Sequence, residues 1–321
     1  MTLAMVSKIV FPSTSTHNEI IIRQCNSVRI ESGWEMLTDT AVIVLPRNVR
    51  DFDKLNVKTI FKKGDPVEIY LGYDENLVLE FTGFISEVSA DIPVKIKCDD
   101  YMYLLKKHSV NVAMKNSKLS DLIRAIVPAG IDYEVADINI APKRYPNTTA
   151  AKILEDLQDN NIYSYFVGKK LIVGKIYTDN TTEPVVLNFT QNVVDNNLQY
   201  KNKEDVIIKI IATSTLPKGR KLKAEFGDDF GQEQHLSYYN IQLKSELLYL
   251  AKLDYEKYKV EGFDGTITIF GMPSVRHGMK AQIISNQYPD RKGLYHIKKV
   301  TKEFDDSPKY RQILNLDKKA Q

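Results

Sequence analysis

The sequence has very little cysteine and tryptophan. Its 321 residues include two cysteines, Cys25 and Cys98, and one tryptophan, Trp34. The two cysteines lie far apart in the sequence and form no Cys-x-x-Cys pair, which excludes a disulfide framework and a zinc-thiolate site of the usual spacing. We therefore expect two reduced thiols, as in proteins that fold in the cytosol.

Long hydrophobic runs and a strong charge of one sign are also lacking. No stretch approaches the roughly 18 apolar residues that a membrane span needs, and the opening MTLAMVSKIVFPSTSTH has neither the basic start nor the cleavage site of a signal peptide. The formal net charge is +3, with no polybasic segment. We expect no membrane insertion and no dedicated nucleic-acid-binding domain.

Motifs that carry catalysis or bind metals are missing as well. None of the five histidines lies within helical reach of another, and the sequence contains no His-Glu-x-x-His, calcium-loop, Gly-x-Ser-x-Gly or phosphate-binding glycine-lysine motif. We expect His296, beside Tyr295 in a predicted strand, to be a half-buried sheet residue. The sequence thus predicts no catalytic residue, no cofactor site and no metal site, and a protein that is not an enzyme.

Three acidic pairs leave one catalytic alternative to weigh. Asp99-Asp100, Asp228-Asp229 and Asp305-Asp306 could each suggest the two carboxylates of a glycosidase. Adjacent residues in turns usually point apart, however, and aspartate is common in turns because its side chain bonds the local backbone. We interpret these pairs as turn residues.

Short β-strand patterns dominate what is present. In the last part of the chain they are predicted at Thr266–Phe270, Ala281–Ile284, Leu294–Phe304 and Tyr310–Leu316. The breaks between them carry the Gly, Pro and Asp residues that tight turns require. Strands at this spacing predict an antiparallel meander with one face in a core. Alternation of the same kind recurs between Lys8 and Asp99, which predicts a second such region.

The two β regions share a layout. In each, a glycine (Gly64 or Gly278) precedes a strand, and a second glycine (Gly83 or Gly293) lies in or opens a long strand. A turn that contains proline then leads to the closing strand. The repeated order predicts two similar β domains.

A segment with helical patterns separates the two β regions. Apolar residues recur at helical spacing in Leu119–Ile126 and in Ala150–Leu157, and a hairpin is predicted to turn at Gly168-Lys169. The polar segment Thr178–Glu183 is predicted to be a linker. These features predict a small α+β unit between the two β domains.

The remaining segment mixes strands and one helix. Val206–Thr213 and Leu222–Phe226 are predicted to be strands and Gly227–Gln234 a loop. A helix near 242–261, ended by Gly262, is predicted to lie across the second β domain. The predicted fold is therefore mainly β with an α+β insertion. The predicted domains are a first β-barrel at 1–109, the insertion at 110–177, and a second β-barrel with its packed helix at 178–321.

Three stretches carry a resemblance to a known family. They read SVRIESGWEMLTDTAVIVLPR, then the series GDPVEIYLGYD to EFTGFISEV to VKIKCDDYMYLLKK, and finally GTITIFGMPSVRHGM through GLYHIKKVTKEF to YRQILNL. Together they resemble the baseplate hub proteins of contractile phage tails, the late control protein D family, and the N-terminal region of type VI secretion spikes of the VgrG type. The TAAKILEDLQDNNI helix with its hairpin is similar to the unit inserted in that family.

The resemblance implies an architecture and a set of partners. It implies two tail-tube-like antiparallel β-barrels per chain and a homotrimer whose six barrels form a pseudo-sixfold ring. The implied partners are a tail tube protein, a central spike protein and baseplate wedge proteins, with DNA passing through the lumen without specific binding. The implied location is the tail baseplate of a virion, or of a prophage or related contractile injection system, assembled in the cytoplasm of a bacterial host.

Two other functions stay open at the level of sequence. One is a cell-wall hydrolase of the tail tip. The other is a stand-alone β module that binds carbohydrate or nucleic acid, for which the 18 tyrosines would provide stacking surfaces.

Overall fold

The computed structural model describes residues 4–15, 17–46, 60–89, 93–115, 117–140, 142–159, 161–177, 183–216, 220–239, 241–259, 261–286, 292–307 and 309–320. Strands account for 54% of the structure and helices for 15%, and the sheets are largely antiparallel. The predicted fold class, mainly β with an α+β insertion, is confirmed. No described helix is long and apolar enough to cross a membrane.

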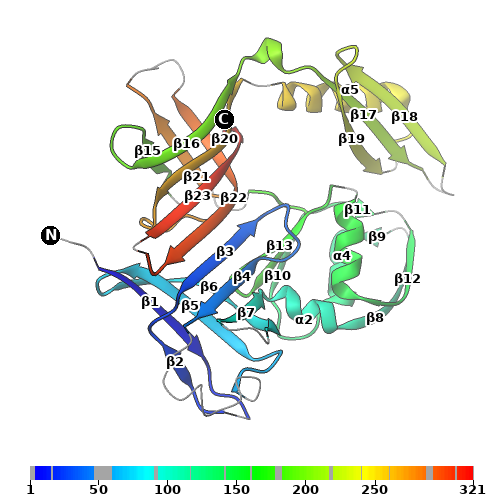
Figure 1. Cartoon of the computed structure of the whole chain (residues 1–321). Coiled ribbons are helices and arrows are strands. Elements are labelled where there is room, and N and C mark those ends of the chain that lie inside the picture. Colours follow the sequence, from blue (N-terminus) through cyan, green and yellow to red (C-terminus); the bar gives the residue numbers. More distant parts are fainter. Residues whose placement is uncertain are drawn as a thin grey trace.

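The first barrel is a curled sheet near the N-terminus (Figure 1). Its strand order is β3-β4-β7-β6-β5-β1, with the short β2 (Ile20–Ile22) beside β1. Ile9 of β1 and Val28 of β3 lie in the same hydrophobic core although their strands are at opposite ends of that order, so the sheet wraps around one core. The strand bounds are β1 Met5–Phe11, β3 Ser27–Gly33, β4 Thr40–Leu45, β5 Pro66–Tyr73, β6 Asn76–Val88 and β7 Val94–Asp99.

The second barrel uses the C-terminal strands and encloses a core of its own. Its strand order is β16-β20-β23-β22-β21-β15. The four strands predicted in this region are present, each extended by one to several residues at its ends. The strand bounds are β15 Val185–Asn188, β16 Val193–Lys201, β20 Gly262–Phe270, β21 Lys280–Ile284, β22 Gly293–Asp305 and β23 Lys309–Lys319.

The two barrels have the same topology. Position by position along the two orders, β3 corresponds to β16, β4 to β20, β7 to β23, β6 to β22 and β5 to β21. The last step differs, because β1 pairs β5 antiparallel whereas β15 pairs β21 parallel. The duplication predicted from the repeated layout is therefore visible in the strand order.

The paired glycines of the predicted layout occupy equivalent places. Gly64 and Gly278 both have positive φ, at 100° and 83°, which glycine adopts without the steric cost that a Cβ brings. The Gly64 N–H donates to the Ile85 carbonyl at 2.8 Å, and the Gly278 N–H donates to the Ile297 carbonyl at 2.8 Å. Ile85 and Ile297 are thus equivalent residues of the two long strands.

The α+β insertion follows the first barrel through α2 (Met102–Lys107). Its helices α3 (Leu119–Ile126) and α4 (Ala150–Gln158) lie where helical spacing predicted them, and their apolar faces share one buried cluster. The hairpin of β13 and β14 turns at Gly168, which has a φ of 59°. The remaining strand bounds are β8 Ser109–Met114, β9 Ser117–Lys118, β10 Tyr133–Val135, β11 Asn139–Ile140, β12 Lys143–Thr149, β13 Ser164–Val167 and β14 Lys170–Val173.

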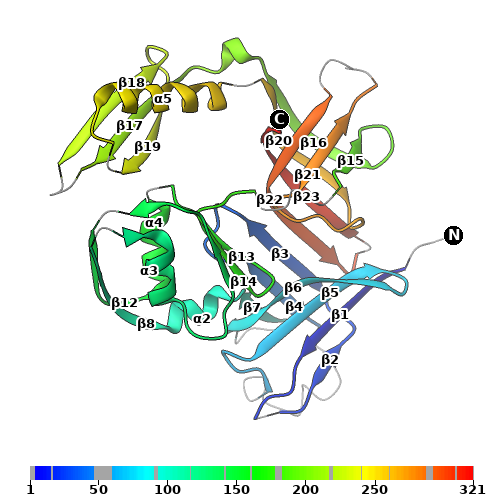
Figure 2. The ribbon, with the colours of Figure 1, turned by 180° about the vertical axis from the view of Figure 1, so that it is seen from behind.

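A separate three-stranded unit interrupts the second barrel between β16 and β20. It consists of β17 (Ile208–Thr215), β18 (Lys221–Gly227), β19 (Gln232–Tyr239) and helix α5 (Lys244–Tyr258), after a single turn of 3-10 helix at Lys203–Asp205. Figures 1 and 2 show this unit standing apart from the strands of the barrel.

Helix α5 packs differently from the expectation. Leu247 and Ala251 are fully buried against residues of β17 and β18, not across the barrel strands, because the inserted sheet supplies its own apolar face. The predicted loop at Gly227–Gln234 was wrong at its end, since β19 begins at Gln232 and adds to β17. Gly262 does not cap the helix, which ends at Tyr258; it opens β20 beside the Tyr295 ring.

Most of the predicted linker, residues 178–182, lies outside the described residues. The chain enters the second barrel at β15 soon after it and leaves that barrel again after β16.

The packing of α5 predicts unequal effects for two neighbouring leucines. Leu247 is fully buried, whereas Leu248 is 40% exposed. Leu247→Ala should lower the free energy of unfolding of this unit by about 3 kcal/mol, because it leaves a cavity under the helix. Leu248→Ala, the matched control, should change it by less than about 1 kcal/mol. Urea denaturation followed by circular dichroism measures both, and equal effects would contradict this packing.

Candidate functional site

The two barrels meet in a continuous β-ladder, which we call the seam. β23 covers one side of β22, while on the other side β21 pairs with its first residues and β3 with its last. The β22–β3 ladder is antiparallel and runs from Lys299 opposite Gly33 to Asp305 opposite Ser27. The strands of both barrels thereby belong to one hydrogen-bonded sheet.

The tip of the β22–β23 hairpin completes the core of the first barrel. Phe304 and Tyr310 belong to the second barrel in sequence, but both lie in the first barrel's hydrophobic cluster. Tyr310 is fully buried, and its ring lies 5.6 Å from that of Tyr73, whose hydroxyl donates to the Tyr310 carbonyl at 3.3 Å. The first barrel therefore lacks part of its core without the second.

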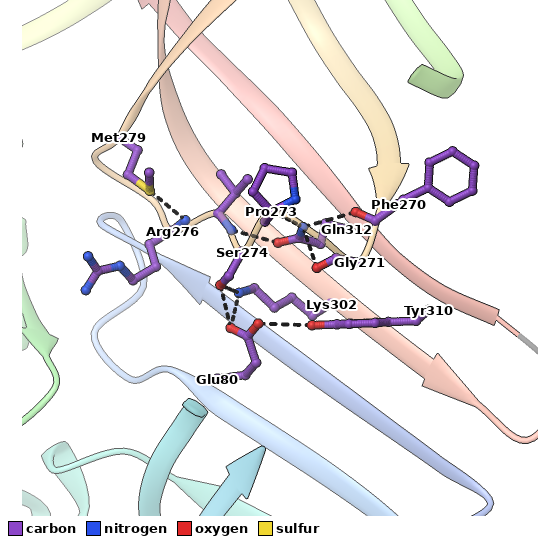
Figure 3. Close-up of polar contacts among 11 residues, drawn as sticks. Glu80, Phe270, Gly271, Pro273, Ser274, Arg276, Met279, Lys302, Tyr310 and Gln312 are labelled. Atoms are coloured by element: carbon purple, nitrogen blue, oxygen red, sulfur yellow. Dashed lines mark hydrogen bonds and ion pairs between the residues drawn. The ribbon is translucent and has the colours of Figure 1, made fainter. Parts of the chain in front are cut away.

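A buried ion pair lies behind this tip (Figure 3). The Lys302 ammonium of β22 pairs with the Glu80 carboxylate of β6, and their side chains are only 4% and 1% exposed. Ser274 Oγ donates to Glu80 Oε2 at 2.8 Å and accepts from Lys302 Nζ at 2.8 Å, while Tyr310 Oη donates to Glu80 Oε1 at 3.0 Å. Burial lowers the pKa of Lys302, and the adjacent Glu80 carboxylate opposes that shift.

Gln312 of β23 holds the loop that carries Ser274. Its side chain is fully buried, and its Nε2 donates to the carbonyls of Phe270, Gly271 and Pro273 at 3.1, 3.0 and 2.7 Å. Its Oε1 accepts from the Val275 N–H at 2.9 Å. One amide therefore satisfies several backbone groups that strand pairing leaves open, and this fixes the loop against the seam (Figure 3).

The outer face of the seam carries ion pairs that are partly exposed. Arg29 Nη1 lies 2.7 Å from Glu303 Oε1, and Lys299 Nζ lies 2.7 Å from Glu31 Oε2. Exposed pairs of this kind contribute little to stability, roughly 0 to 1 kcal/mol each. In this register each pair sets opposite charges beside each other across the ladder.

Trp34 joins the seam to the α+β insertion. Its ring is 7% exposed and packs edge-on against Tyr163 at 4.8 Å, and its Nε1 donates to Asp317 Oδ2 of β23 at 3.2 Å. Tyr177 donates to the same carboxylate and stacks on His296 with ring centroids 3.7 Å apart. Trp34, which follows β3 of the first barrel, thus contacts both the α+β insertion and the second barrel.

A cavity of about 260 Å³ lies at the same junction. It is lined by Asp39 and Asp100 of the first barrel, by the β13–β14 hairpin and by the loop that carries Arg276 and His277. The Asp39 N–H donates to Asp100 Oδ2 at 3.2 Å, and His277 Nε2 lies 3.9 Å from Asp39 Oδ2. Burial raises the pKa of Asp100 to about 7 and lowers that of His277 to about 4; burial and then Asp100 raise the pKa of Asp39.

The residues that the sequence singled out are not brought together. Asp100 accepts from the Met102 N–H at 2.9 Å just before α2, and Asp305 accepts from the Ser307 N–H at 3.0 Å, so both bond the local backbone as turn residues do. Asp228 accepts from Lys259 Nζ. Within the described ranges, no group of three or more His, Cys, Asp and Glu residues is placed to hold a metal ion. His296 is half-buried in β22, as predicted.

Sequence reasoning missed the residues that form the seam. Lys302 and Glu80 are charged residues within the strands β22 and β6. A charge on an inward face is the available signal, but it does not identify its partner, which lies 222 residues away.

Comparison with known proteins gives a shared fold. No protein-family model matches the chain, and no curated protein matches it in sequence. Among solved structures, the chain is similar along nearly its whole length to a tail protein and a prophage tail protein, and it is also similar to part of a PdpA–VgrG complex and to a component of the type VI secretion system of E. coli. The fold seen here is therefore one that tail proteins use.

Three of these structures are representative. A tail protein from Neisseria meningitidis matches at a TM-score of 0.68 and 13% identity, over 99% of this chain and 97% of that one. The 43 kDa tail protein of prophage MuSo2 from Shewanella oneidensis matches at 0.64 and 15%, over 97% and 98%. A chain of the Francisella PdpA–VgrG complex matches at 0.59 and 12%, over 98% of this chain and 58% of that one.

The buried ion pair predicts a large cost for removing one partner. Glu80→Ala leaves the Lys302 ammonium buried and without its counter-charge, which should lower the free energy of unfolding by about 3 to 5 kcal/mol. Asp137→Ala in the α+β insertion removes an ion pair to Lys118 whose side chains are 81% and 57% exposed, and serves as the matched control. Chemical denaturation should show little change for the control; a Glu80→Ala loss as small as the control's would refute the role given to the pair.

The cavity predicts a pH-dependent effect for Asp100→Asn. An unfolded aspartate has a pKa of about 4, and the folded pKa of Asp100 is about 7. Its contribution to stability is therefore fully present below pH 4 and is lost as pH rises through 7. The asparagine cannot ionise, and it removes the charge that raises the pKa of Asp39, so the stability difference between wild type and variant should shift in favour of the variant from pH 5 to pH 8.

Urea unfolding at a series of pH values measures this difference. The contribution of His277 to stability has the opposite dependence on pH. It is present above the unfolded pKa of about 6.5 and is lost as pH falls through about 4. Because His277 is retained in both proteins, its contribution cancels in the comparison. A stability difference that stays constant with pH would contradict the assignment.

Proposed function

We propose that the chain is a structural baseplate hub of a contractile phage tail or a related injection machine, of the late control protein D type, and that it acts as a homotrimer without enzymatic activity. The observation that carries this proposal is the fusion of two topologically equivalent barrels through the β22–β3 ladder. The fold shared with phage tail proteins along the whole chain supports it.

The duplication has a direct consequence for symmetry. Three chains with two equivalent barrels each place six similar barrels around one axis. Such a ring presents near-sixfold symmetry to a hexameric tail tube protein on one side and threefold symmetry to a central spike protein on the other. A pair of barrels held rigidly by a shared core and a shared sheet suits this role, because the spacing of the six barrels must not vary.

We also propose the domain bounds, the partners and the location of the protein. The domains are the first barrel at 1–109, the α+β insertion at 110–177 and the second barrel at 178–321, which carries the β17–β19 unit with helix α5. The insertion and this unit project from the barrels and are the parts available to baseplate wedge proteins. DNA passes through the lumen without specific binding, and the protein resides in the tail baseplate after assembly in the bacterial cytoplasm.

Mass photometry at low micromolar concentration tests the proposal. We expect a species of three times the chain mass of 36.7 kDa, which negative-stain electron microscopy should show as a ring. A protein that stays monomeric at all accessible concentrations would contradict the hub. Turnover of peptidoglycan by the purified chain would favour the hydrolase instead, and saturable binding of a carbohydrate or oligonucleotide by a monomer would favour the stand-alone module.

A further inference from the structure

The two barrels are equivalent, but the joint between them uses a different strand from each. Within the chain, β22 of the second barrel pairs with β3 of the first. The strand equivalent to β22 in the first barrel is β6, and the strand equivalent to β3 in the second barrel is β16. The same joint can therefore be made again only between β6 of one chain and β16 of another, which is the head-to-tail arrangement that generates rings.

The edge of β16 has no second partner in the described part of the chain. β16 pairs with β20 on one side and ends the strand order on the other. It is nine residues long, and most of its side chains are exposed, including Val194 at 45%. A long regular edge presents a row of unpaired N–H and C=O groups that readily accepts another strand.

The end of β6 is similarly open on one side. β7 pairs with Glu87 and Val88 on one side of β6. On the other side, the pairing with β5 stops at Phe84 opposite Pro66. Among the described residues, no strand covers this side of Glu87 and Val88, where β3 covers the equivalent part of β22.

The hydrogen-bond register fixes which residues are equivalent. Ile85 and Ile297 are equivalent, and the ladder shifts register directly after each, between Ile85 and Glu87 and between Ile297 and Lys299. Glu87 of β6 therefore corresponds to Lys299 of β22.

The same register identifies the partner residues on β16. In the first barrel, Glu87 pairs with Lys97, Lys97 with Val42, and Val42 with Arg29. In the second barrel, Lys299 pairs with Asn315, Asn315 with Thr266, and Thr266 with Asn197. Asn197 is thus equivalent to Arg29. Counting along the strands, Lys201 is equivalent to Gly33 and Tyr200 to Ser32.

We propose that β6 of one copy adds antiparallel to the free edge of β16 in the next copy, with Glu87 opposite Lys201 and Val88 opposite Tyr200. This reproduces the intrachain pairs Lys299 with Gly33 and Val300 with Ser32. It rests on the proposed ring and names the surface that closes it. This register sets a carboxylate opposite an ammonium group, and then a β-branched residue opposite an aromatic residue. Within the chain, Glu87 also pairs with Lys97 and Lys201 with Asp264, and both pairs are exposed.

The two joints of the ring differ in length. The intrachain ladder pairs seven residues of β22, from Lys299 to Asp305. The described end of β6 offers a shorter run, Glu87 and Val88. The joint between chains is accordingly the weaker of the two, so the ring should dissociate on dilution into chains whose own seam stays intact.

A cysteine pair tests the register. Glu87→Cys and Lys201→Cys are placed in one chain, with side chains that are 59% and 51% exposed in the wild type. Mild oxidation should link neighbouring copies into a covalent trimer on non-reducing electrophoresis. The native Cys25 and Cys98 are buried and should not react in the folded protein. Each single variant, and Glu87→Cys combined with Val186→Cys on the opposite edge strand β15, should give no covalent trimer.

The outcomes separate this inference from the proposed function. A covalent trimer formed only by the 87/201 pair supports the pairing. If mass photometry shows trimers but neither this pair nor the adjacent Val88→Cys/Tyr200→Cys pair forms a covalent trimer, the ring stands and its closure through β16 is overturned. A monomer under all conditions overturns both, and a disulfide formed within one chain also overturns the pairing.

Discussion

The pairing of Lys302 with Glu80 is the constraint on which the rest of the structure depends. Each charge is almost fully buried and comes from a different barrel. The pair therefore constrains how the barrels join, because any arrangement that buries one charge without the other carries a large desolvation penalty. Ser274 and Tyr310 complete the hydrogen bonds of the carboxylate, and Gln312 holds the loop that positions Ser274. The seam thereby combines apolar burial with a polar network that tolerates one arrangement.

The joint between the barrels fixes how the two copies are arranged. Two copies of one topology could sit side by side in many ways, but the β22–β3 ladder fixes their spacing and direction. Since the ladder joins unlike surfaces, the end of β6 and the edge of β16, which are equivalent to its two strands, have no corresponding partner among the described residues. The α+β insertion and the β17–β19 unit are additions to this pair of barrels. The insertion is held to it through Trp34 and Asp317.

Much of the fold could be predicted from local patterns. The alternating strands of both barrels, the helices α3 and α4 and the hairpin at Gly168 lie where the sequence indicated, because burial on one face and turn chemistry act over a few residues. The prediction was wrong where local signals were weak. β19 carries polar residues such as Gln232 and Gln234 and is a strand through its pairing with β17, and α5 has apolar residues on both faces, so its packing partner was not evident.

By itself the sequence determined the mainly β class, the repeated layout and the lack of recognisable catalytic motifs, since these depend on residue type and short spacing. Only the tertiary structure decided that β22 pairs with β3, that Lys302 meets Glu80, and that Phe304 and Tyr310 fill the core of the other barrel. These contacts join residues more than 200 positions apart. No periodicity along the chain encodes such a partner, because the free energy that selects it comes from burial and pairing of the assembled barrels.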